Sequence, residues 1–414
     1  MTDQGSHVQP DHFDVAIVGA GIVGLAVARE LRRRHPDISM VILERENDVA
    51  QHQTGHNSGV IHSGVYYTPG SLKARMCVEG SQLMYEYCDE HSIRYERCGK
   101  LIVALTPQEI SGLDELERRG RANNVAGLRR LAADEIAEIE PGCRGIEALH
   151  CPGTGIVNYH EVSSSLASEL RGQGVEIRFG TPVHGLERVN SITKVTCDVG
   201  SVSASFVIGC AGLWSDRLAV SAGAPADPQI VPFRGAYLTL NESPTPVVRG
   251  LVYPVPDPEL PFLGVHVTKL INGDVVLGPT AMLVLARDGY RVSTIRLQDV
   301  WDIIRWPGTW KMFRKFWRTG IDEIMMAAMR RRLLKEAEKY VPAVGEYGLR
   351  AGISSGVRAQ ALGRDGALVD DFVLSETPGS IHVRNAPSPA ATSSLALARE
   401  IVDRVQASVD WTFG

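Results

Sequence analysis

A glycine-rich segment near the N-terminus constrains the fold more than any other part of the chain. A short apolar run, residues 15–18, is followed by Gly19-Ala20-Gly21-Ile22-Val23-Gly24, which is a G-x-G-x-x-G pattern. Gly19 allows a tight turn, Gly21 lets the backbone approach a pyrophosphate, and Gly24 lets a helix pack closely on the strand. The pattern therefore predicts a strand, a phosphate-binding turn and a helix whose free N–H groups face the ligand.

The residues after this turn complete a dinucleotide-binding unit. Apolar positions 23, 26, 27 and 31 fit one buried helical stripe, and Pro36 ends the helix. A second strand at residues 40–43 leads into Glu44, at about the spacing where an acidic side chain accepts a ribose hydroxyl. A structural βαβ unit that binds no nucleotide is the alternative interpretation.

Composition and length narrow the class of protein. The 414 residues are 44% hydrophobic and 22% charged, which is ordinary for a globular protein of about two domains. A formal charge of -5 does not indicate a nucleic-acid partner. The seven cysteines form no C-x-x-C pair, so we expect no metal site and a reducing compartment. The first residues resemble no signal peptide and no run could span a bilayer, so we expect a cytoplasmic protein.

Three later segments predict further contacts to the same ligand. The polar loop at residues 51–59 supplies Thr54, Asn57 and Ser58, although a plain surface loop is the alternative. A strand at residues 205–209 runs into Ala211-Gly212, and a strand-like segment begins near Val183. A third strand, residues 381–385, leads through Ala390-Ala391-Thr392 into a helix. Because these segments are far apart in the sequence, we expect FAD rather than NAD.

The middle of the chain predicts a second domain. Residues 230–278 alternate between apolar and polar positions, which is typical of an antiparallel sheet, and further strands are expected at 353–359 and 367–374. The fold class is therefore α/β, with a Rossmann-like FAD-binding domain interleaved with an α+β substrate domain. We assign residues 13–90, 155–225 and 350–410 to the first domain, and 91–154 and 226–349 to the second.

Seven segments spread along the chain carry distinctive motifs. They are G-H-N-S-G-V-I-H-S-G at 55–64, V-P-F-R-G at 231–235, Y-P-V-P-D-P at 253–258, F-L-G-V-H at 262–266, G-V-R-A-Q at 356–360, L-V-D-D-F at 368–372 and N-A-P-S-P-A-A-T-S-S at 385–394. These motifs resemble those of the L-2-hydroxyglutarate oxidases and dehydrogenases, which belong to the D-amino-acid-oxidase-like flavoproteins, and the resemblance covers nearly the whole chain. It implies FAD as the cofactor and oxidation of L-2-hydroxyglutarate to 2-oxoglutarate, with hydride transfer from C2 to flavin N5.

The chemistry of a 2-hydroxy acid indicates which residues act in the site. A base with a pKa near neutrality suits proton removal from the hydroxyl, which favours His62 and His266 in the matching motifs. By analogy with related flavoproteins, Arg358 binds the C1 carboxylate, because a bidentate arginine suits a carboxylate best. Candidates for the second carboxylate are Arg234, Tyr253 and Lys269. Core histidines and solvated arginines are the alternatives for these positions.

Two other functions stay open on the sequence. One is a related enzyme that oxidises an amino acid or glycerol 3-phosphate, and the other is a flavin-binding partner at a membrane surface without turnover. The identity of the histidine that is the base and covalent attachment of FAD through His56 or His62 also stay open, although we expect a non-covalent cofactor.

Residues 301–332 differ in composition from the rest of the chain. Tryptophans and phenylalanines interleave with lysines and arginines, followed by Met325, Met326 and Met329. Aromatic rings favour the bilayer interface and basic side chains favour anionic head groups. We expect two short helices, broken at Pro307-Gly308, that attach the enzyme peripherally to the inner face of a membrane. Electrons would then pass to a quinone rather than mainly to oxygen. A core or oligomer contact is the alternative for the aromatic residues.

Overall fold

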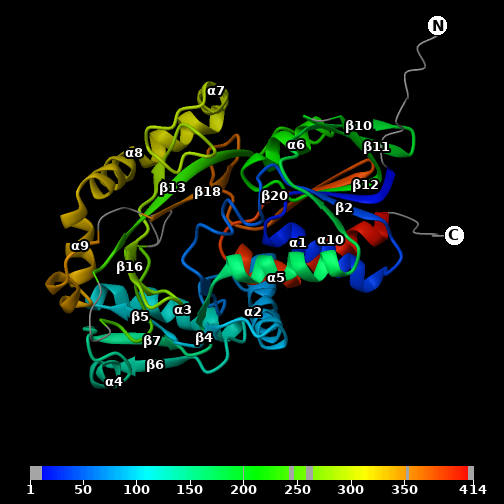
Figure 1. Cartoon of the computed structure of the whole chain (residues 1–414). Helices are drawn as coiled ribbons and strands as arrows, with labels where there is room; N and C mark the ends of the chain where they lie inside the picture. The colour runs from blue at the N-terminus through cyan, green and yellow to red at the C-terminus, as the bar shows by residue number, and fades with distance from the viewer. Residues whose placement is uncertain (1–11, 199, 242–246, 258–263, 351–353, 409–414) are drawn as a thin grey trace, which may run out of the picture.

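The predicted βαβ unit forms and lies within a mainly parallel sheet (Figure 1). The computed structural model describes residues 12–198, 200–241, 247–257, 264–350 and 354–408. α1 (Ile22–Arg34) connects two parallel strands, β1 (His12–Val18) and β2 (Met40–Leu43). Three arginines in the last turn of α1 complement the negative end of its dipole.

The first sheet gathers strands from three distant parts of the chain. β1 pairs in parallel with β12 (Ser201–Gly209), and β12 pairs in parallel with β20 (Ser380–Asn385). Among the described residues the sheet has eight strands. The remaining members are β9 (Glu176–Arg178), β10 (Val183–Val189), β11 (Ile192–Cys197) and β19 (Val373–Thr377).

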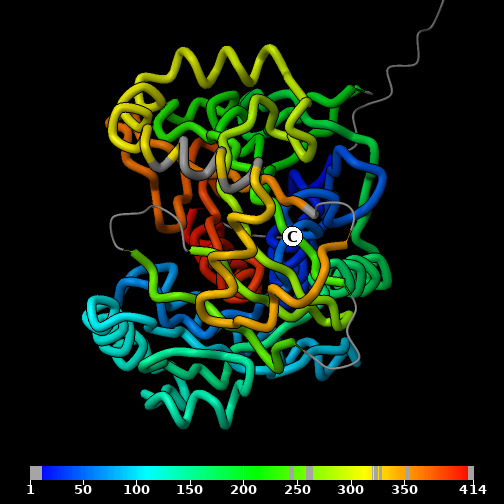
Figure 2. The backbone as a smooth tube through the Cα atoms, turned by 90° about the vertical axis from the view of Figure 1, so that its left-hand side faces the viewer, coloured from blue at the N-terminus to red at the C-terminus, as the bar shows by residue number. Residues whose placement is uncertain are grey.

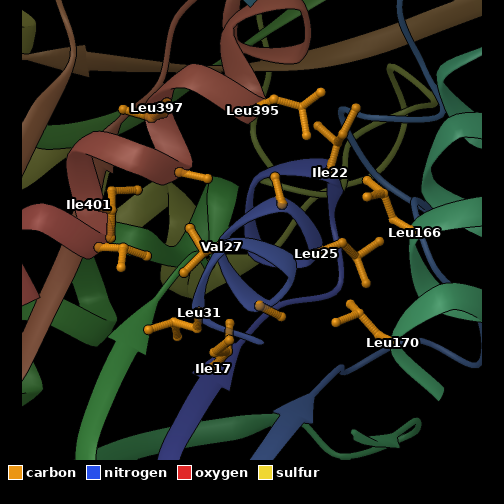
Figure 3. Close-up of a cluster of buried hydrophobic side chains, with 14 of the residues drawn as sticks. Ile17, Ile22, Leu25, Val27, Leu31, Leu166, Leu170, Leu395, Leu397 and Ile401 are labelled. Atoms are coloured by element: carbon orange, nitrogen blue, oxygen red, sulfur yellow. The ribbon is translucent and has the colours of Figure 1, made fainter. Parts of the chain in front are cut away.

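Helices from both ends of the chain cover one face of this sheet. α1 packs against α5 (Tyr159–Gly172) and α10 (Ala390–Ser408), and α10 also packs against α2 (Leu72–Glu90). Figure 3 shows Leu25 of α1 near Leu166 and Leu170 of α5, and Val27 on the side of α10. Gly80 lets α2 approach α10 closely, because a Cβ there would lie 2.5 Å from the carbonyl oxygen of Thr392.

The second sheet has nine strands among the described residues and is antiparallel except where β14 pairs with β5. β13 (Gln229–Thr239) pairs with β18 (Ser354–Leu362) over nine positions, and both lie beside the first domain (Figure 1). The other strands are β5 (Lys100–Ala104), β6 (Arg129–Ala132), β7 (Glu147–Cys151), β14 (Leu251–Pro254), β15 (His266–Lys269), β16 (Val275–Gly278) and β17 (Met282–Leu283).

Smaller elements complete the described part of the chain. A three-stranded sheet consists of β3 (Val60–Ile61), β4 (Tyr95–Glu96) and β8 (Gly155–Val157). Two α-helices, α3 (Ile110–Ala122) and α4 (Ala133–Ile139), lie near β5, β6 and β7, and α6 (Ser215–Ser221) packs on β20. Three short 3-10 helices are η1 (Pro107–Glu109), η2 (Gly212–Trp214) and η3 (Pro342–Glu346).

Two predictions about the C-terminal third are wrong. We assigned residues 350–410 to the FAD-binding domain, but β18 belongs to the second sheet because it pairs with β13. The first residue of the strand expected at 353–359 lies outside the described part of the chain. The strand expected at 367–374 forms instead at Val373–Thr377, because Leu368 makes only an isolated bridge to Leu362 and the chain bends at Asp371. Asp371 in that segment accepts hydrogen bonds from the backbone at the start of α2.

The aromatic, basic segment forms three helices rather than the two short ones expected. They are α7 (Leu297–Arg305), α8 (Pro307–Ala328) and α9 (Arg330–Glu338), and Pro307 begins α8 as predicted for a break. Figures 1 and 2 place α7 and α8 along the outer side of the second sheet. Among the described residues, no helix combines the length and hydropathy that crossing a membrane requires.

Candidate active site

A cavity of about 570 Å³ runs between the two sheets, from the carboxyl ends of β1 and β2 to β13 and β18. In open parallel sheets this end of the strands is where ligands bind. The cavity lining brings together the start of α1, the loop after β2, the segment after β12 and the start of α10. All the cofactor residues predicted from the sequence except Gly24 line it: Gly19, Gly21, Glu44, Thr54, Asn57, Ser58, Val183, Ala211, Gly212, Ala390, Ala391 and Thr392.

The glycine turn leaves no room for larger side chains. Gly19 has φ of +107°, and a Cβ there would lie 2.5 Å from the carbonyl oxygen of Cys210. A Cβ at Gly24 would lie 2.0 Å from the carbonyl oxygen of Gly19, so this glycine serves helix packing rather than the cavity wall. Gly21 is the N-cap of α1 and provides no side-chain cap. The start of α1 is thus a helix N-terminus beside a cavity, which suits a phosphate, and the backbone nitrogen of Ile22 donates to the hydroxyl of Thr54 at 3.2 Å.

Glu44 supports the turn as well as the cavity. Its buried carboxylate accepts hydrogen bonds from the backbone nitrogen of Ala20 at 2.6 Å and of Glu46 at 3.0 Å. Each carboxylate oxygen has a second lone pair available for a ligand hydroxyl. The predicted contact between Glu44 and a ribose stays a prediction.

The hydroxyl of Thr392 joins the start of α10 to the loop that carries His62. It accepts from the backbone nitrogen of His62 at 3.1 Å and lies 3.0 Å from the hydroxyl of Tyr159. Small residues precede it at the helix start, so the backbone itself forms that wall. The glycine turn, the Ala211-Gly212 segment and the start of α10 together make a long, narrow cavity with two helix N-termini, which fits FAD.

Alternation along β13 decides which of its side chains face the cavity. Phe233 lies opposite Arg358 in the register, and both line the cavity together with Tyr237. Arg234, one residue out of phase, projects from the other face, and its Nε donates to the carbonyl oxygen of Tyr290 at 2.9 Å. The structure therefore brings Arg358 into the site and leaves Arg234 outside the cavity lining.

The two predicted catalytic histidines differ in their relation to the cavity. His62 lines the cavity, whereas the ring of His266 is stacked on Tyr253, with ring centroids 3.6 Å apart. Burial holds the pKa of His62 well below its usual value, and the charges of Lys100, His266 and Lys73 act in the same direction. Burial also lowers the pKa of His266 to about 3, reinforced by Lys100 and Arg358. Both rings are neutral near pH 7.

The remaining candidates for substrate-binding residues differ in whether another side chain already pairs with them. Lys269 forms an ion pair with Glu96 at 2.6 Å, so its charge is already compensated. Tyr253 is buried and faces the same side of the sheet as His266, which it contacts. Phe262 and Leu263, in the F-L-G-V-H motif, lie outside the described residues.

Sequence reasoning missed Lys100. This lysine begins β5, is 1% exposed, and lies with its Nζ 4.5 Å from the ring centroid of Tyr66 and 5.0 Å from that of Tyr253. A signal was present, because the segment K-L-I-V-A reads as a strand buried on both faces, which places a lysine inside the protein.

Comparisons with known proteins agree with this geometry. The family model described as FAD dependent oxidoreductase matches residues 14–404. L-2-hydroxyglutarate dehydrogenases from Nematostella vectensis and Indibacter alkaliphilus are 46% and 42% identical, over 96% and 93% of this chain and 91% and 96% of theirs. The human mitochondrial enzyme of that name is 45% identical over 95% of this chain and 89% of its own.

Solved structures of lower identity share the fold. A reduced L-alpha-glycerophosphate oxidase from Mycoplasma pneumoniae with FAD bound has a TM-score of 0.78 at 23% identity, covering 96% of this chain and 95% of that one. Glycine oxidase from Geobacillus kaustophilus has a TM-score of 0.72 at 20% identity, with 97% and 96% covered.

Proposed function

The chain belongs to the FAD-dependent oxidoreductase family. We propose that it binds FAD in the cavity and oxidises L-2-hydroxyglutarate to 2-oxoglutarate, with His62 as the base. The choice of substrate rests on the similarity to L-2-hydroxyglutarate dehydrogenases from animals and a bacterium, which extends over more than nine-tenths of the chain. The expectations of an α/β FAD fold and of this enzyme class are confirmed.

The reaction removes a hydride from C2 and a proton from the hydroxyl of the substrate. Bound FAD supplies the hydride acceptor at its N5 atom. His62 lines the cavity with a neutral ring, so it can accept the hydroxyl proton. His266 is not among the residues that line the cavity and is stacked on Tyr253, so its proposed role is to position the site rather than to receive the proton. Of the two candidate histidines, we therefore propose His62 as the base.

Arg358 supports binding of the substrate's C1 carboxylate. Its side chain is half-buried, comes from β18 and lines the same cavity as His62. A guanidinium at this place can bind a carboxylate through two parallel hydrogen bonds and orient C2. Arg234 and Lys269 are engaged with Tyr290 and Glu96, so we do not assign them to the substrate.

A substrate panel tests this function on the purified protein. We expect flavin absorption bands, and we expect L-2-hydroxyglutarate to reduce the flavin under anaerobic conditions. D-2-hydroxyglutarate, glycerol 3-phosphate and amino acids should reduce the flavin at least about 100-fold more slowly. Either their configuration at C2 or the group they place at the position of the second carboxylate would not fit the site. Faster reduction by glycerol 3-phosphate or an amino acid would transfer the chain to another branch of the family, and absence of any reduction would remove the enzymatic proposal.

We further propose that α7 and α8 contact an anionic membrane surface and that the enzyme passes electrons to a quinone. Trp301, Trp310, Phe313 and Trp317 are exposed there, each by 41% or more. Exposed basic side chains lie between them, namely Arg305, Lys311, Arg314, Lys315 and Arg318. This combination is typical of interfacial helices. Trp306 is an exception, because its buried ring donates to the carbonyl oxygen of Leu362 and belongs to the core.

Vesicle binding tests the membrane proposal. Replacing Trp301, Trp310 and Trp317 together by serine should weaken binding to phosphatidylglycerol vesicles by more than about tenfold, because three interfacial anchors are lost. The pair Val189→Ser and Ile192→Ser removes exposed apolar side chains from the β10–β11 hairpin and should leave binding unchanged. Equal binding of all three proteins, or no binding by the parent chain at low salt, would discard the proposal. Activity with a soluble quinone analogue, compared with oxygen consumption, tests the acceptor.

A further inference from the structure

We propose that Lys100, together with the hydroxyl of Tyr66, binds the second carboxylate of the substrate and so sets the preference for dicarboxylic 2-hydroxy acids. The inference rests on the proposed function and extends it to a residue pair outside the motifs that indicate the family. Lys100 and Tyr66 are neighbours with buried hydrogen-bond donors, and both lie outside the residues that line the cavity.

The first observation is a buried lysine without an acidic partner among the described residues, and burial lowers the pKa of this lysine. The Nζ atom of Lys100 is buried and has no hydrogen-bond partner among the described residues, and its near neighbours are the rings of Tyr66 and Tyr253. A ring face attracts an ammonium only weakly, and a fully buried charge normally requires an ion or hydrogen-bond partner. The nearest thiols do not supply one, because burial raises the pKa of Cys77 to about 12 and also raises that of Cys151.

The second observation is that donors gather here without an acceptor. The hydroxyl of Tyr66 is also buried with no partner among the described residues, although its ring lies beside Lys100. Buried polar groups in native proteins are nearly always paired, so two unpaired donors side by side indicate a ligand with acceptor oxygens. A carboxylate offers two such oxygens and the missing negative charge.

The position of Lys100 fits one end of a short dicarboxylate. The register places Leu251 beside Lys100, and two residues further along β14 the ring of Tyr253 stacks on His266. The charge of Lys100 lowers the pKa of both His62 and His266, and the charge of Arg358 lowers that of His266. Two basic side chains therefore lie near the histidines, and among the described residues Lys100 has no acidic partner. A dianion with carboxylates at both ends matches this arrangement.

Two other lysines are less suitable for binding a carboxylate, because each already has an acidic partner. Lys73 is also buried, but it forms an ion pair with Asp370 at 2.7 Å and is thus structurally compensated. Lys269, the sequence-based candidate, is paired with Glu96. Lys100 differs from both in having no acidic partner among the described residues, and the two provide internal references for the experiment.

The experiment compares two substrates that share a five-carbon chain. L-2-hydroxyglutarate carries the second carboxylate, and L-2-hydroxyvalerate carries a methyl group in its place. In Lys100→Met, kcat/KM for L-2-hydroxyglutarate should fall roughly 10- to 150-fold, the range for a lost hydrogen bond to a charged group, while that for L-2-hydroxyvalerate changes less than about threefold. Lys73→Met is the matched control and should leave the ratio between the two substrates unchanged.

Two further measurements keep the proposal testable if Lys100→Met folds poorly. Tyr66→Phe removes only the hydroxyl and should lower the same ratio severalfold. Binding of glutarate and of valerate, followed by the shift in melting temperature of the FAD-loaded protein, reports affinity without turnover, and only glutarate should lose affinity. An unchanged substrate ratio in both variants, with wild-type activity on L-2-hydroxyglutarate intact, would overturn this inference alone. A wild-type enzyme inactive on that substrate would overturn the proposed function and this inference with it.

Discussion

Replacing His62 by alanine should slow reduction of the bound flavin by L-2-hydroxyglutarate by about 10²- to 10⁴-fold, the usual contribution of a positioned general base. His62 lines the cavity, and its backbone nitrogen is fixed by the hydroxyl of Thr392 at 3.1 Å. Because that backbone contact survives the substitution, FAD content should stay close to the wild-type value. Stopped-flow reduction under anaerobic conditions measures the rate directly.

Substitutions of two other histidines serve as reference variants for His62→Ala. His160→Ala removes an imidazole from α5, outside the cavity lining, and should reduce flavin at the normal rate. His266→Ala removes the ring stacked on Tyr253 and should lower the rate less than His62→Ala does. A His62→Ala enzyme that reduces flavin within about threefold of wild type would show that the base lies elsewhere, and a greater loss in His266→Ala would reverse the two roles.

The pH profile gives an independent view of the same residue. The neutral form of His62 is the active one, and burial holds its pKa well below the usual 6.5, so kcat/KM should not fall between pH 8 and 6 as it would for an exposed histidine. The lowering charges come from Lys100 on β5, His266 on β15 and Lys73 on α2. Removing the charge in Lys100→Met should raise the pKa of His62 and move the acidic limb to higher pH.

The cofactor half of the site was predictable because its signals are local. Gly19 and Gly24 are required by contacts of a Cβ with backbone atoms of the same turn or the adjoining segment, and such requirements leave a fixed spacing in the sequence. The small residues at 211–212 and 390–392 mark places where backbone itself forms the wall. The structure places all of them except Gly24 around one cavity.

The substrate half was less predictable because it depends on pairing between distant strands. β13 pairs with β18 more than a hundred residues later, and this register alone separates Arg358 from Arg234. The same pairing explains why β18 was assigned to the wrong domain. Lys100 was missed because a lysine in a sequence is by default an exposed residue, although the apolar residues that follow it indicate a strand buried on both faces.

The aromatic segment shows a third kind of ambiguity. Trp306 and Trp310 are four residues apart with similar neighbours in the sequence, yet one is 5% exposed and the other 60% exposed. Their difference arises because Pro307 begins a new helix and turns the chain between them. Composition predicts that such rings bury their faces somewhere, but only the packing of α7 and α8 decides which of them face outward.

Arg358→Lys should raise KM for L-2-hydroxyglutarate roughly 10- to 150-fold, because the charge remains while the two-pronged contact to the C1 carboxylate is lost. Arg358 lies on β18 opposite Phe233, and both face the cavity that contains His62. Arg234→Lys is the matched control from the neighbouring strand, since that side chain donates to the carbonyl oxygen of Tyr290 outside the cavity lining. It should change KM less than about threefold, and steady-state kinetics with a dye acceptor measure both variants.

The pattern across substrates separates Arg358 from Lys100. Every 2-hydroxy acid carries the C1 carboxylate, so Arg358→Lys should raise KM for L-2-hydroxyvalerate by about the same factor as for L-2-hydroxyglutarate. Lys100→Met should instead affect the dicarboxylate alone, because only that substrate places a charge at the far end. Unchanged KM and kcat for both acids in Arg358→Lys would remove Arg358 from the site. If Arg358→Lys impaired only the dicarboxylate, the substrate would lie in the reverse direction, with its C1 carboxylate toward Lys100.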